Sequence, residues 1–262
     1  MTEPDGTVAP TPLPTSAVAD APAPQPADAG SDRVPALAWV IGAIFVAVEL
    51  RRAHPLLDPR VFALPRLRAG ALGVVAAFGG SFAMFYVNAQ YLTVVHGYSL
   101  LRAGCAIAPI AVAMTVGSRS STGLTRRLGA RRVIGLGFAA QVAGLVAFSL
   151  VGPGTPYLGY ILCPALALAG VGLALPPLSG AIMSSLPLER AGAGSGINGA
   201  AREVGSALGV AAMGTALGGN VAGHARSAAA LTGSMDAGFR AVALAVAVAA
   251  VLVVRWSGST GS

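Results

Sequence analysis

Charged residues are scarce in this chain of 262 residues: they make up 10% of it, and none of its seventeen basic residues is a lysine. Aromatic residues account for 6% and cysteine for two residues, whereas hydrophobic residues account for 55%. The mean hydropathy of +0.72 lies far from that of a soluble globular domain. The composition excludes such a domain and predicts an all-α, polytopic transmembrane helical bundle.

Sequence signatures of enzyme chemistry are also missing. The chain has no nucleophile motif, phosphate-binding loop or pair of catalytic carboxylates, so we expect no enzyme. Cys105 and Cys163 stand in apolar surroundings without a metal-ligand spacing, which predicts two buried thiols, no metal and no cofactor. The arginines fall in short connections and form no continuous basic face, so nucleic acid is not an expected partner.

The N-terminal 33 residues differ in composition from the rest. Residues 1–33 are rich in Ala, Pro, Thr and Asp, and they have too little apolar surface to offset the entropy of ordering. We therefore expect a disordered tail. Glu3 and Asp5 stand where a signal peptide needs positive charge, and the first apolar run begins too late for one. The first span is expected to stay in the mature protein.

Seven apolar runs approach the ~20 residues that cross a bilayer. They lie near residues 34–50, 69–95, 103–116, 133–151, 157–183, 194–217 and 237–254. The third run is short unless the Ser-rich residues 117–122 complete it, and the sixth is so rich in Gly and Ala that hydropathy alone leaves it doubtful. The predicted organisation is one helix at 34–50, a connection over 51–68, a six-helix domain over 69–255 and a tail over 256–262.

The arginines predict the orientation of these spans. Residues 118–132 hold five arginines, which cannot lie in a hydrocarbon core, and short arginine-rich loops stay on the cytoplasmic side. With that loop inside, the connections over 51–68, 119–132 and 184–192 and the C-terminus carry twelve arginines, and the opposite side carries four. We expect a multi-pass protein of the plasma (inner) membrane, in contact with the lipid bilayer, with its N-terminal tail outside and its C-terminus in the cytoplasm.

Four stretches carry a family resemblance. They are Glu49-Leu50-Arg51-Arg52 with the residues that follow as far as Phe62; Gln90-Tyr91-Leu92 with His96-Gly97-Tyr98-Ser99 ahead of Pro109; Arg126-Arg127-Leu128-Gly129-Ala130-Arg131-Arg132; and Leu186 to Gly205. In this order and spacing they resemble the C-terminal portion of the fourteen-helix drug:proton antiporters of the major facilitator superfamily, the drug:H+ antiporter-2 branch. The resemblance covers about residues 34–255.

The resemblance implies export of small amphipathic compounds in exchange for protons. It also implies that the N-terminal six-helix bundle of the family has no counterpart in this sequence, so the chain is expected to be a half or truncated transporter. Transport would then need a separately encoded N-terminal half or a homodimer, since the two halves of this fold are related by an axis along the membrane normal. The alternative is a non-transporting truncated product or a membrane partner or scaffold subunit.

Charged and amide side chains within the predicted spans are the candidate site residues. Glu203 is the only acid in the interior of a predicted span, since Glu49 stands at the end of the first, and it adjoins Arg202, about two turns from the cytoplasmic end. The pair is either an interface charge pair or a gate and coupling site. Asn88, Gln90 and Gln141 are either residues of a substrate cavity or members of interhelical hydrogen bonds.

Two further groups of residues are predicted to shape the fold. By resemblance, Arg126, Arg127, Gly129, Arg131 and Arg132 form the short cytoplasmic loop motif of the superfamily, although Arg126 stands where the family has Asp. Close helix approach is predicted at two pairs of glycines with GxxxG spacing, Gly205 with Gly209 and Gly214 with Gly218.

Overall fold

A computed structural model of the chain describes residues 64–90, 92, 100–152, 155–221 and 228–258. The chain divides into two units, Met1–Pro55 and Leu56–Ser262, and every described residue belongs to the second. The tail predicted over 1–33 and the span predicted at 34–50 lie outside the described residues. The described residues of the other six predicted spans are almost all helical, which confirms the all-α bundle.

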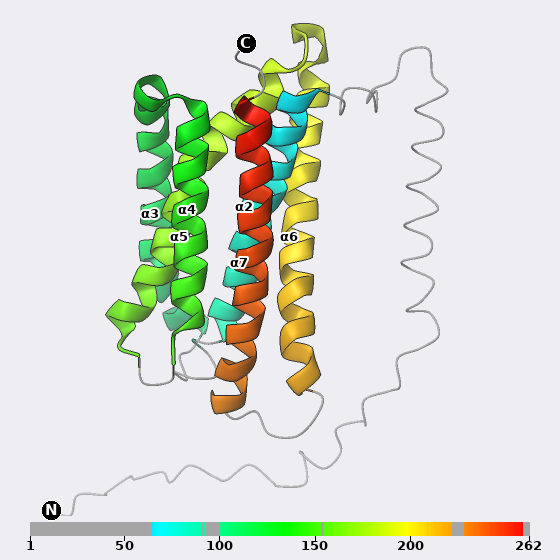
Figure 1. Ribbon diagram of the computed structural model, residues 1–262. Coiled ribbons are helices and arrows are strands. Elements are labelled where there is room, and N and C mark those ends of the chain that lie inside the picture. Colours follow the sequence, from blue (N-terminus) through cyan, green and yellow to red (C-terminus); the bar gives the residue numbers. More distant parts are fainter. Residues whose placement is uncertain (1–63, 91, 93–99, 153–154, 222–227, 259–262) are drawn as a thin grey trace, which may run out of the picture. The chain divides into compact units, whose positions relative to one another are not determined.

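The described residues form six long α-helices and one short 3₁₀ helix. They are α2 (Pro65–Gln90), α3 (Leu100–Leu128), α4 (Ala130–Ser149), α5 (Tyr157–Ser184), η4 (Leu188–Arg190), α6 (Ala191–Val221) and α7 (Ala228–Gly258). Figure 1 shows the long helices side by side, nearly parallel to a common axis. Four of them contain segments long and apolar enough to cross a membrane: Pro65–Asn88, Ala130–Ser149, Tyr157–Ser184 and Met235–Gly258.

The helices pack in two layers. In one layer α3 packs on α5, α5 on α2 and α2 on α6; in the other, α4 packs on α7, and this pair covers α5 and α2. Large buried side chains fill the interior: the centre of the Phe148 ring of α4 lies 4.9 Å from that of Phe239 of α7 within one layer, and 5.5 Å from that of Tyr160 of α5 in the other layer. As a consequence, α3 and α6 stand at the two ends of a row and are covered the least.

The predicted loop at 119–132 is wrong. Only Gly129 separates α3 from α4, and its φ of 82° lies in the region that glycine adopts without a steric penalty. The Ser-rich stretch is part of α3, where the Ser120 hydroxyl donates to the Val116 carbonyl oxygen at 2.8 Å and the Ser121 hydroxyl donates to the Leu173 carbonyl oxygen of α5 at 2.7 Å. Arginines assigned to a loop therefore lie on helices.

Two helices extend a few residues beyond the spans predicted from the sequence. Helix α2 begins at Pro65 rather than at residue 69, because proline fits the first helical position, where its missing N–H has no helical partner. Helix α7 continues to Gly258, into the predicted tail.

One end of the bundle collects most of the arginines that the structure describes. The start of α2, the α3–α4 turn, the α5–α6 connection and the end of α7 meet there. The parts lie close together, since a Cβ added at Gly70, Gly258 or Gly194 would meet Ile182, Arg131 or Met183 within about 3 Å. We call it the arginine-rich end; it comprises Arg66, Arg68, Arg126, Arg127, Arg131, Arg132, Arg190 and Arg255.

Candidate functional site

Helix α6 carries charged side chains near its middle. The helix has 31 residues and begins at Ala191, so Glu203 lies about 18 Å along its axis, at 1.5 Å per residue. The sequence placed Arg202 and Glu203 about two turns from the end, but the earlier start of the helix puts them more than three turns in. Both side chains are exposed on the described bundle.

A neighbouring contact gives the depth of Arg202 independently. Its guanidinium carbon lies 5.2 Å from the centre of the Phe78 ring, within the range of a cation–π interaction. Phe78 is at the middle of α2, a helix of 26 residues. Arg202 therefore lies near the middle of the bundle, where a charged side chain that faced lipid would cost several kcal/mol.

Helix α3 also carries a charged side chain far from its end, which was not predicted to lie in a helix. Arg119 lies nine residues before Leu128, or about 13 Å from the end of the helix, and its side chain is exposed. Its neighbour Ser118 borders Gly172 of α5. The assignment of Arg119 to a cytoplasmic loop is thus wrong, and its depth could not be read from hydropathy because Ser and Thr surround it.

An aromatic row lies beside Arg202 on α2. The rings of Phe78 and Phe82 stack with centres 6.2 Å apart, and Phe82 meets Phe85 edge to face at 6.0 Å. Phe82 is exposed and the other two are half-buried. Spacings of four and three residues place all three rings on one helix face, a signal that was available in the sequence. Together with Arg202 they form what we call the Arg–Phe face.

A polar contact between α5 and α6 is a further feature that the sequence did not indicate. The hydroxyl of Ser179 donates to the Asn198 side-chain oxygen at 3.3 Å, and both side chains are half-buried. Asn198 precedes Arg202 by four residues, so the two lie on one side of α6.

The amides Asn88 and Gln141 are buried within the bundle. Gln141 Nε2 donates to the carbonyl oxygen of Ala77 at 2.9 Å and so joins α4 to α2. Tyr160 of α5 donates its hydroxyl hydrogen to Asn88 Oδ1 of α2. Gln90 is the last residue of α2, and its side chain lies outside the described residues.

Each buried amide keeps one polar atom unused. Within the described part of the chain, Asn88 Nδ2 and Gln141 Oε1 have no hydrogen-bond partner. Both amides therefore join helices in this bundle, and each retains one group that a further partner could use. Whether either contacts a substrate stays a prediction.

Close approach is confirmed for Gly205 and Gly209 of the GxxxG prediction, whereas Gly214 meets no described atom. A Cβ at Gly205 or Gly209 would collide with the carbonyl oxygens of Val75 and Gly79, so α6 lies directly against the backbone of α2. Around Gly214, by contrast, no described atom lies within 4 Å of such a Cβ. The surroundings of Gly218 lie outside the described residues.

The motif arginines sit at the arginine-rich end. Arg126 and Arg127 end α3, Arg131 and Arg132 begin α4, and all four are exposed.

Cys105 is also exposed, so the prediction of a buried thiol is wrong there, whereas Cys163 is half-buried. No group of three or more His, Cys, Asp or Glu side chains suited to a metal occurs in the parts of the chain that the structure describes.

The outer faces of α4 and α7 contrast with those of α3 and α6. Between Arg132 and the end of α4, and between Arg240 and Arg255 of α7, every exposed residue is Ala, Leu or Val. Such faces suit lipid, and with the four apolar spans they define a multi-pass integral membrane protein.

The chain belongs to the Major Facilitator Superfamily, whose family profile matches residues 11–210. Members of this family are transporters and not enzymes. The superfamily predicted from the sequence is thereby confirmed.

Individual relatives share about a third of their aligned residues with the chain. The cephamycin export protein CmcT of Amycolatopsis lactamdurans is 35% identical over 207 residues, which are 78% of this chain and 43% of that protein. The puromycin resistance protein pur8 of Streptomyces alboniger is 34% identical over 220 residues, covering 80% and 43%. The multidrug resistance protein Stp of Mycobacterium tuberculosis is 31% identical over 185 residues, covering 67% and 32%. The chain spans less than half the length of these curated relatives.

Proposed function

We propose that the bundle is the C-terminal half of a drug or antibiotic exporter that exchanges its substrate for protons, of the fourteen-helix drug:H+ antiporter-2 branch. The observation that carries the proposal is the position of exposed charges well inside α3 and α6, about 13 Å and about 18 Å from the helix ends that lie at the arginine-rich end. Charges at that depth face a water-filled path or a second bundle, because facing lipid is costly. The names of the relatives, which concern export and resistance, agree with this.

The Arg–Phe face is proposed to form one wall of the substrate path. Its stacked phenylalanines offer aromatic surface to small amphipathic compounds, and Arg202 stands at its edge. Glu203 is the proposed coupling group, since it is the one acid at mid-helix depth among the described residues. Asn88, Gln90 and Gln141 remain proposed cavity residues, each with the alternative of a purely structural role.

The opposite wall is proposed to come from a second bundle, because alternating access needs two halves that move about a central site. An N-terminal half, on the same or another chain, or a second copy of this chain fits the need. The arginine-rich end is proposed to face the cytoplasm in the plasma membrane, in line with the distribution of arginines.

Transport by proteoliposomes tests the proposal. The full chain is reconstituted alone and together with an N-terminal half of a relative, and dye movement driven by a proton gradient is recorded. Glu203→Gln is expected to abolish gradient-driven movement. Glu189→Gln, which removes an exposed carboxylate in η4 at the arginine-rich end, is expected to leave it intact.

Three outcomes would count against the proposal. Equal movement by the two variants would remove Glu203 from the coupling step. Movement that persists without a proton gradient would exclude antiport. No movement above empty liposomes in either arrangement would overturn transport and favour a non-transporting membrane subunit.

A further inference from the structure

The arginine-rich end has far more positive than negative charge. Eight arginines lie there, and Glu189 is the one carboxylate among the described residues of that end. The ion pair recorded within the described ranges, Arg240 with Asp236 at 2.8 Å, involves neither that carboxylate nor those arginines. This excess of positive charge attracts anions from outside the chain.

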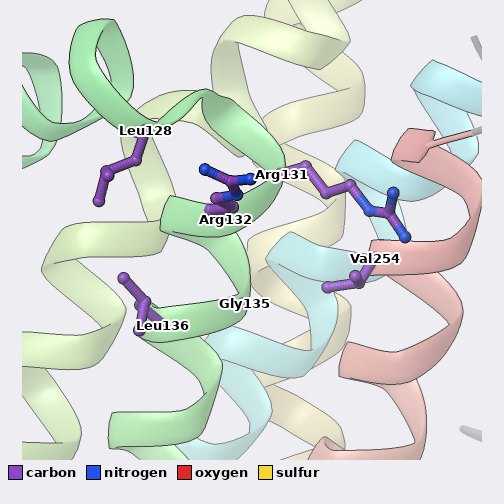
Figure 2. Close-up of a pocket in the computed structure, with 6 residues that line it drawn as sticks. All are labelled: Leu128, Arg131, Arg132, Gly135, Leu136 and Val254. Atoms are coloured by element: carbon purple, nitrogen blue, oxygen red, sulfur yellow. The ribbon is translucent and has the colours of Figure 1, made fainter. Parts of the chain in front are cut away.

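A hollow of about 570 Å³ opens at this end between α3, α4 and α7. It is lined by Leu128, Arg131, Arg132, Gly135, Leu136 and Val254. We call it the α4 hollow, since four of these residues belong to α4. In Figure 2, Arg131 extends toward α7 above Val254, whereas Arg132 stays on the side of Leu128, so the two guanidinium groups flank the opening.

The lining of the α4 hollow changes from charged to apolar within about one turn of helix. Arg131 and Arg132 begin α4, and Leu136 lies four residues after Arg132, or about 6 Å deeper. Gly135 has no side chain to fill the hollow. A Cβ at this position would lie 3.7 Å from a Val254 methyl group, at ordinary contact distance. Deeper along α4 and α7 the exposed residues are the apolar ones that suit lipid.

We propose that the α4 hollow binds an anionic phospholipid of the leaflet at the arginine-rich end. Arg131 and Arg132 hold its phosphate, and one acyl chain lies along Leu136 and Val254. Guanidinium groups match phosphate oxygens through charge-assisted hydrogen bonds. No carboxylate lines the hollow to hold the cationic part of a zwitterionic headgroup, which favours anionic lipid. This site requires a membrane protein but is independent of the proposed transport.

Binding of phosphatidylglycerol and phosphatidylcholine to the purified full chain tests the site, with native mass spectrometry counting the bound lipids at each concentration. We expect tighter binding of phosphatidylglycerol. The double variant Arg131→Ala, Arg132→Ala should weaken it about 25-fold, because each arginine near a membrane surface contributes about fivefold.

Two further variants separate the site from general charge. Arg126→Ala with Arg127→Ala removes the same charge at the same end but removes no side chain that lines the hollow. This control should change affinity less than about twofold. Gly135→Leu fills the hollow while both arginines remain, and it should weaken lipid binding with no change in charge.

Each contrary result overturns a distinct part of the proposal. Equal losses for the two arginine pairs would mean non-specific attraction. Displacement of the lipid by inorganic phosphate or sn-glycerol 3-phosphate would mean a site for free phosphate. Equal binding of phosphatidylcholine would exclude headgroup selectivity, and unchanged binding by Gly135→Leu in a chain of native helicity would move the lipid elsewhere.

Discussion

The outer faces of α4 and α7 and the exposed faces of α3 and α6 lie on the same bundle, yet they suit different surroundings. The first pair presents only Ala, Leu and Val across the middle of the helices. The second pair presents Arg119, Arg202 and Glu203 at that depth, and neither helix passes as a membrane span on composition. The difference teaches that helices of one bundle are matched to distinct solvents: lipid for α4 and α7, water or protein for α3 and α6.

Adding a charge to the lipid-matched face should have the largest effect. Val248 of α7 is 54% exposed and lies about 15 Å from the helix end, so Val248→Arg places a cation deep in lipid. An arginine at the centre of a span costs about 2.5–3.5 kcal/mol on insertion scales. We expect the yield of folded, monodisperse protein after detergent extraction to fall to about a tenth or less.

The matched change on α6 is Ser206→Arg, which adds the same charge three residues from Glu203, where the two side chains can pair. Its yield should stay near that of the parent chain. A similar loss for both variants would remove the distinction between the two faces.

Adding side-chain volume where α6 contacts α2 should have the next largest effect on stability. Gly209→Val puts side-chain atoms against the carbonyl oxygen of Gly79, and overpacking of this kind costs about 1–3 kcal/mol. Gly214→Val makes the same change on the same helix, where the described atoms leave open space. Unfolding by titration with a denaturing detergent should separate the two variants, and equal stabilities would show that the helices do not meet at Gly209.

Removing an interior amide should have a smaller effect. Gln141→Met keeps the volume but loses the hydrogen bond to Ala77, and interhelical hydrogen bonds in membranes contribute about 0.6 kcal/mol on average and about 1.7 at most. Leu136→Met, on the lipid-matched face of the same helix, should leave the unfolding midpoint unchanged. A variant Gln141→Met of parental stability that no longer exports would instead favour contact between Gln141 and substrate.

The cation–π contact on the Arg–Phe face should make the smallest contribution to the free energy of unfolding. A double-mutant cycle of Arg202→Gln and Phe78→Leu is expected to yield a coupling of about 0.5–1 kcal/mol, the range for exposed pairs. The measurement is again the free energy of unfolding. Additive effects of the two changes would show that the guanidinium leaves the Phe78 ring in the membrane-embedded protein.

The order of the described helices could be predicted from the sequence, because long apolar runs separated by charged connections can form few structures in a bilayer other than spanning helices. The sequence left residues 117–122 open as the completion of a span and wrongly assigned residues 123–128 to a loop, since a polar helix face and a loop have the same composition. In the structure the whole stretch belongs to α3. The depth of Arg202 was misjudged for a related reason: the Gly- and Ala-rich start of α6 gives no hydropathy signal for where the helix begins.

Other parts of the site depend on contacts between distant residues. The sequence identified Asn88 and Gln141 but could not supply their partners, which stand 72 and 64 residues away. Of the two glycine pairs with equal spacing, only Gly205 and Gly209 are known to touch a neighbour, because helix crossing selects which small residues meet another backbone. The phenylalanines at 78, 82 and 85 were accessible to sequence reasoning through their helical spacing.

Chemical labelling across the bilayer tests the central distinction most directly. Single cysteines replace Arg119, Arg202, Leu136 or Val248 in a chain whose Cys105 and Cys163 are changed to alanine, and a charged, membrane-impermeant maleimide is added to proteoliposomes. Because thiols react as thiolates in water, we expect rapid labelling of Arg119→Cys and Arg202→Cys and almost none of Leu136→Cys and Val248→Cys. Equal rates at all four positions, or faster labelling on α4 and α7, would contradict the account.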